Sequence, residues 1–108
     1  ANISANMQAF LERASVVADM NRGENLLQHK VGAAVTAARR GGALTTLDAM
    51  YHFFMLQNMF VVGSSYWAFG YGQMPGDVRK DEEGLETMRN LGQNMAYLLK
   101  ALEERRNG

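Results

Sequence analysis

The chain of 108 residues contains no cysteine, and this absence excludes several kinds of chemistry. Without thiols, none of its residues can form a disulfide, act as a cysteine nucleophile, or hold zinc or an iron–sulfur cluster through thiolates. A small secreted scaffold that depends on disulfides is therefore excluded as well.

An excess of one charge and long apolar segments are also missing. Eleven Lys and Arg residues balance eleven Asp and Glu residues, so the formal net charge is zero. No positive excess is available for binding nucleic acid by bulk charge. No apolar run approaches the roughly 20 residues that a membrane-spanning helix needs. We therefore expect neither nucleic acid nor a membrane as partner, and the composition fits one globular domain.

The first residue is Ala1 rather than Met, and a helical pattern follows almost at once. The start has no basic segment followed by an apolar stretch, so it does not read as a signal peptide. We expect that sequence upstream of Ala1 has been removed.

Three segments have the apolar spacing of amphipathic helices. We predict them at about Ser4–Met20, from Gly42–Thr46 to Gln57–Asn58, and at Asp81–Arg106. The third segment has acidic residues in its first turn and basic residues in its last, as the helix dipole favours.

Two short apolar segments between these helices are predicted to be strands, Lys30–Ala38 and Met59–Ser64. Both are apolar on both sides, as a parallel sheet covered by helices requires. Strand, helix and strand together span about 35 residues, the size of a βαβ unit, so we expect parallel strands joined by a right-handed crossover.

The order helix, strand, helix, strand, helix predicts an α/β fold. Two parallel strands are too few for a free-standing core, because such sheets usually have about five. We interpret the chain as the C-terminal part of a larger doubly wound α/β domain. The alternative is that copies of this chain complete each other's sheet.

Ligands of open α/β sheets bind at the carboxyl ends of the strands, which here gives Ala37–Ala43 and Ser64–Gly76. In the first segment, Gly41 and Gly42 would let a flat ligand approach the backbone. The N–H groups of the following helix favour an anionic or electron-rich partner. The alternative is that the glycines only form a tight turn and that Arg39 and Arg40 face solvent.

The predicted loop Ser65–Lys80 contains four aromatic residues, three glycines and the single proline. Its aromatic side chains could stack on a planar ring or form a partner interface. They could equally fold over their own contacts. We expect His29 and His52 to have surface or packing roles and no metal, and Asp81–Glu83 to mark a helix start.

Several segments carry a family resemblance: Asn2–Arg13, Lys30–Ala34, Arg39–Gly42 with Thr45–Leu47, Val61–Trp67, and Pro75–Gly92. In this order they resemble the NADPH-dependent FMN reductase family, in the branch that includes iron–sulfur flavoproteins and multimeric flavodoxin-like reductases. The resemblance covers nearly the whole chain.

The resemblance implies a flavodoxin-like fold that binds FMN, and hydride transfer from NADPH or NADH to the flavin and on to a small-molecule or protein acceptor. It also implies a cytoplasmic homo-oligomer, a dimer or tetramer. By position, Asn2 would lie beside the isoalloxazine and Tyr66 and Trp67 near the ring or at a subunit contact. Backbone groups would line the other edge of the ring at Ala37, Ala38, Arg39, Arg40, Gly41 and Gly42.

The chain also departs from the family pattern. The family's first strand and its Ser/Gly-rich phosphate loop would lie upstream of Ala1, so residues 1–108 would be the C-terminal portion of one flavodoxin-like domain. Ser65 replaces a usual proline and Ala68 a usual glycine. Because backbone N–H groups around the phosphate supply much of FMN recognition, we expect weak or no FMN binding by this chain alone.

The sequence therefore supports three hypotheses. The first is an FMN-dependent NAD(P)H oxidoreductase of the flavin or quinone reductase type, of which this chain is a fragment. The second is an FMN-carrying electron-transfer protein without its own nicotinamide site. The third is a non-catalytic assembly module that uses its aromatic loop and Met-rich helices for protein contact.

Overall fold

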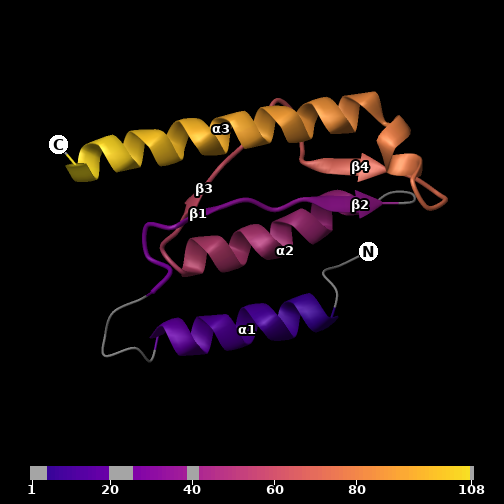
Figure 1. Cartoon of the computed structure of the whole chain (residues 1–108). Coiled ribbons are helices and arrows are strands. Elements are labelled where there is room, and N and C mark those ends of the chain that lie inside the picture. Colours follow the sequence, from indigo (N-terminus) through magenta and orange to yellow (C-terminus); the bar gives the residue numbers. More distant parts are fainter. Residues whose placement is uncertain (1–4, 20–25, 39–41, 108) are drawn as a thin grey trace.

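The computed structural model describes residues 5–19, 26–38 and 42–107. The elements, in chain order, are α1 (Ala5–Asp19), β1 (Val31–Gly32), β2 (Thr36–Ala38), α2 (Ala43–Leu56), β3 (Phe60–Val61), β4 (Phe69–Tyr71), the 3-10 helix η1 (Asp77–Lys80) and α3 (Glu82–Asn107). Helix α3 covers one face of the strands, and α2 and α1 lie on the other (Figure 1). The molecule thus has the flavodoxin-like α/β layering that the sequence predicted.

The strands pair in parallel, as predicted. Val31 of β1 is opposite Phe60 of β3, and Ala37 of β2 is opposite Gly70 of β4. The intervening segment includes α2, so the βαβ arrangement is confirmed. None of the described helices is both long enough and apolar enough to cross a bilayer.

The predicted continuous strands are wrong in detail. The segment Lys30–Ala38 is interrupted after Gly32 and resumes at Thr36, and the segment Met59–Ser64 forms a strand only at Phe60–Val61. The cause is a difference in length between the two partners. Three residues, 33–35, separate β1 from β2, whereas seven residues, 62–68, separate β3 from β4. The longer side must leave the sheet and return; we call residues 62–68 the excursion.

The predicted loop Ser65–Lys80 is also more ordered than its glycines suggested. It contains β4, which pairs with β2, and η1, which leads into α3. The second strand region therefore ends at Tyr71 rather than at Ser64. The segment that follows the carboxyl end of this strand begins at Gly72. The predicted segment Ser64–Gly76 therefore began too early.

Small side chains allow the helices to approach the strands. A Cβ on Gly32 would lie 3.1 Å from Cδ1 of Phe54, so this glycine lets α2 pack directly on β1. On the opposite face, Val62 and Ala68 are buried against Leu91 of α3. The two ends of the excursion are therefore fixed in the core, although its middle is not.

Part of the sheet has no covering strand. Among the described residues, β1 and β2 each pair on one side only, with β3 and β4. Each of the four described strands therefore keeps one unpaired edge. The radius of gyration is 15.6 Å, compared with about 13 Å for a compact domain of roughly 100 residues.

Candidate functional site

The first helix after β2 in the chain is α2, which starts at Gly42. Gly42 is the N-cap of α2 and has φ 90°, in the left-handed region that favours glycine. No side chain caps this end, and the first turn contains no acidic residue. The first N–H groups of any α-helix lack intrahelical partners, so this end of α2 presents donors and positive partial charge.

The structure places three of the predicted site residues beside this helix start. Ala37 and Ala38 are the last residues of β2, and Gly42 follows at the N-cap. Asn2, Arg39, Arg40 and Gly41 lie outside the described residues. The prediction for those four positions therefore stays a prediction.

The other two predicted site residues, Tyr66 and Trp67, come shortly before β4 in the chain. They belong to the excursion, whose last residue, Ala68, accepts a hydrogen bond from the backbone N–H of Thr36 at 3.2 Å. Because Thr36 pairs with Phe69, the backbone of Trp67 lies before the start of β2 in the strand direction. Their predicted place near a flavin ring or at a subunit contact stays a prediction.

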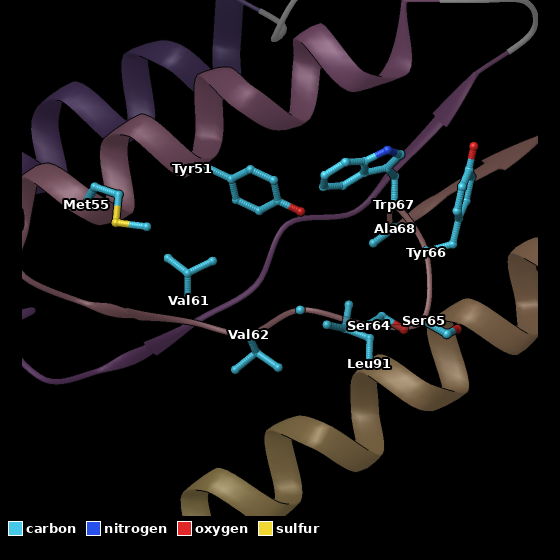
Figure 2. A pocket seen from close by; sticks show the side chains of 11 residues that line it. Tyr51, Met55, Val61, Val62, Ser64, Ser65, Tyr66, Trp67, Ala68 and Leu91 are labelled. Carbon is cyan, nitrogen blue, oxygen red and sulfur yellow. The ribbon is translucent and has the colours of Figure 1, made fainter.

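These two aromatic residues instead line a cavity of about 600 Å³ on the α2 side of the excursion. Tyr51 and Met55 of α2 form the opposite wall, and the hydroxyl of Tyr51 points across the cavity toward Trp67 (Figure 2). Val61, Val62 and Leu91 contribute apolar surface deeper in. The volume lies within the range of roughly 300–1,000 Å³ that is typical of small-molecule sites.

Hydrogen bonds to α3 hold the excursion in place. Ser64 Oγ donates to the carbonyl oxygen of Thr87 at 2.7 Å and accepts from Nδ2 of Asn90 at 3.2 Å. Asn94 Nδ2 donates to the carbonyl oxygen of Gly63 at 2.9 Å. These three bonds fix the backbone of the excursion to α3, on the face opposite α2, which keeps the space in front of Tyr51 open.

The environment of Tyr51 favours its neutral form. Burial raises the pKa of this phenol above its ordinary value near 10.0, and the carboxylate of Asp48 adds to the same effect. Asp48 is exposed and lies one turn earlier on α2. The hydroxyl therefore remains a hydrogen-bond donor at neutral pH.

Asp81 joins the end of β4 to the start of α3. Its carboxylate accepts the backbone N–H of Tyr71 at 2.9 Å and that of Gly84 at 3.0 Å. These two bonds lower the pKa of Asp81 below its ordinary value. The sequence correctly placed a helix start here but missed the link to β4; an Asp followed three residues later by Gly was the available signal.

The histidines have the roles that the sequence predicted. His29 stacks on Phe60 with ring centroids 5.4 Å apart and an interplanar angle of 7°. His52 is exposed on α2, in the groove that faces α1. No group of three or more His, Cys, Asp or Glu side chains in the described residues is placed to hold a metal ion.

Comparison with known proteins agrees with this architecture. A family model described as NADPH-dependent FMN reductase matches residues 1–73, which include α1, the paired strands and α2. The chain belongs to the NADPH-dependent FMN reductase family. An iron-sulfur flavoprotein of Methanocaldococcus jannaschii is 41% identical to this chain over an alignment of 109 residues, which covers 94% of this chain and 54% of that protein. No solved structure matches the chain.

The chain of this FMN reductase family member thus spans about half the length of its curated relative. The family resemblance read from the sequence is confirmed. Residues 1–108 contain no cysteine, so none of them could bind an iron–sulfur cluster through a thiolate.

Proposed function

We propose that this chain forms part of an FMN-dependent oxidoreductase that accepts hydride from NADPH or NADH. The observation that carries the proposal is the start of α2 at Gly42, which follows β2 in the chain and lies within the segment that matches the family. In open α/β sheets this is the end of the strands where ligands bind.

The residues at this end fit one edge of a flavin. Gly42 has no side chain to block a flat ring, and Ala37 offers only a methyl group at the strand end. The N–H groups at the start of α2 would donate to electron-rich atoms on the edge of the ring. When bound, FMN would supply the hydride-accepting chemistry; the protein residues would bind and orient it.

The described residues supply only one wall of such a site. The open edge of β1 and β2 would receive the next strand of a larger flavodoxin-like sheet, and the phosphate-binding loop would come from outside residues 1–108. The complete protein would therefore be the active form, and we place it in the cytoplasm as a homo-oligomer.

Anaerobic addition of NADPH or NADH to the complete, FMN-loaded protein tests the proposal. We expect the visible absorption of oxidised flavin to disappear, and to return when oxygen or another acceptor is added. The proposal would be contradicted if the complete protein bound no flavin. It would also be contradicted if the flavin bound at a site that does not include the start of α2.

A second candidate is an electron-transfer flavoprotein without its own nicotinamide site. The name of the relative, an iron-sulfur flavoprotein, favours it, because iron–sulfur centres and flavins are both groups that transfer electrons. Bleaching by dithionite but by neither nicotinamide would support this candidate over the first.

A further inference from the structure

We infer that the cavity between α2 and the excursion is a second binding site, separate from the proposed flavin edge, for a neutral planar aromatic molecule. The site is formed chiefly by Tyr51, Met55, Tyr66 and Trp67, with Ser64 and Ser65 at its polar side.

The position of the cavity separates it from the start of α2. Tyr51 is eight residues beyond Ala43, the first residue of this helix. At about 1.5 Å per residue, its Cα lies roughly 12 Å along the helix axis from that end. A ring seated against Gly42 would leave Tyr51 and Met55 uncovered.

The excursion is built so that the cavity does not close. Its ends are buried at Val62 and Ala68, and Ser64 is hydrogen bonded to α3 as described above. A loop that was free to move would collapse onto the apolar side chains of α2 and bury Trp67. Instead Trp67 keeps 49% of its surface exposed at the mouth of a formed cavity.

The lining defines the chemistry of the ligand. Tyr51, Tyr66 and Trp67 offer aromatic faces that stack on planar rings. Hydroxyl groups of Tyr51 and Ser65 can bond to a polar substituent, whereas the hydroxyl of Ser64 is held by Thr87 and Asn90 of α3. None of the described residues that line the cavity is charged. An anion would gain no cationic partner and would lie near the carboxylate of Asp48, so a neutral ligand is favoured.

The test uses two probes of equal size and different charge. Naphthalene-2-carboxamide is neutral, and 2-naphthoate carries one negative charge at neutral pH. Isothermal titration calorimetry of the complete protein in its flavin-free form should show saturable binding of the carboxamide with a Kd of about 1 mM or tighter, as ligands of this size reach in apolar pockets. Binding of 2-naphthoate should be at least about tenfold weaker.

Variants assign the binding to this cavity. Trp67→Ala should weaken carboxamide binding at least about tenfold, because a stacking face is lost. Met55→Trp, at an exposed position of the wall, should have a similar effect by filling the space. Tyr97→Ala is the matched control, since Tyr97 is 80% exposed on α3 and does not line the cavity. Its affinity should equal that of the wild-type chain.

Three results would overturn the inference. The first is equal binding of both probes. The second is unchanged affinity in both Trp67→Ala and Met55→Trp, when circular dichroism shows that the two variants are folded. The third is displacement of the carboxamide by FMN. The last result would assign the cavity to the flavin site. Because the titration contains no nicotinamide and needs no bound flavin, its failure leaves the proposed oxidoreductase function untouched.

Discussion

The carboxylate of Asp81 accepts the backbone N–H of Tyr71 at 2.9 Å while its other oxygen accepts the N–H of Gly84. One side chain therefore ties the last residue of β4 to the first turn of α3. A Cβ on Gly70 or Gly84 would contact this carboxylate, so the two glycines make room for the link.

Replacing Asp81 with Ala should lower the Tm of the chain, because two backbone donors lose their acceptor and α3 loses its N-cap. Glu82→Gln is the control, since Glu82 is the exposed neighbour at the same helix start. Thermal unfolding followed by circular dichroism measures both. Equal Tm values for Asp81→Ala and Glu82→Gln at pH 6 would show that the link does not stabilise the fold.

The same link predicts a pH dependence. The pKa of Asp81 is lowered in the folded state, so its contribution is present above the unfolded pKa of about 3.9 and is lost as the pH falls through the folded pKa. The difference in Tm between wild-type chain and Asp81→Ala should be constant from pH 7 to about pH 5 and should shrink below about pH 4. A difference that grew on acidification would contradict this sign.

Two glycines of α3 should respond to alanine in opposite directions. At Gly84 a Cβ would lie 2.5 Å from Oδ2 of Asp81 and 3.2 Å from the Cα of Gly70, so Gly84→Ala should destabilise the fold by about 1–3 kcal/mol. At Gly92 a Cβ meets nothing within 4 Å. Gly92→Ala should stabilise it by about 0.5–1 kcal/mol through helix propensity. Urea unfolding of the two variants measures both signs, and a loss of stability in Gly92→Ala would be inconsistent with its open surroundings.

The core on the α2 side depends on Leu47, which is 0% exposed. Leu47→Ala should cost about 2–5 kcal/mol of unfolding free energy, because the deletion removes buried methyl groups and leaves a cavity. Leu56→Ala, on the same helix at 78% exposure, should change it by less than about 0.5 kcal/mol. Similar effects in the two variants would mean that α2 does not pack as described.

The sequence predicted the three helices and the parallel pairing well, because apolar periodicity and the strand–helix–strand order record them directly. It could not predict the excursion. The segment Met59–Val62 is a continuous apolar run with no sign of where the strand stops, and the mismatch of three against seven residues arises only when both strands pair. The pairing of Phe69–Tyr71 was hidden for the same reason, since glycines and aromatics there are typical of a loop.

Part of the site was also beyond sequence reasoning. The Gly42 start of α2 could be expected from its place after a strand. Tyr51 gave no such signal, because an aromatic residue on the apolar face of a helix is typical of the core. Only the hydrogen bonds that hold Ser64 of the excursion against Thr87 and Asn90 of α3 show that space remains in front of Tyr51.

The central claim is that a flavin edge lies against the start of α2 in the complete protein. Amide hydrogen exchange measured by mass spectrometry, with and without FMN, tests it most directly. The account predicts slower exchange in the peptide spanning residues 42–46 and unchanged exchange in residues 97–107 at the end of α3. Bound FMN without protection of residues 42–46 would contradict it.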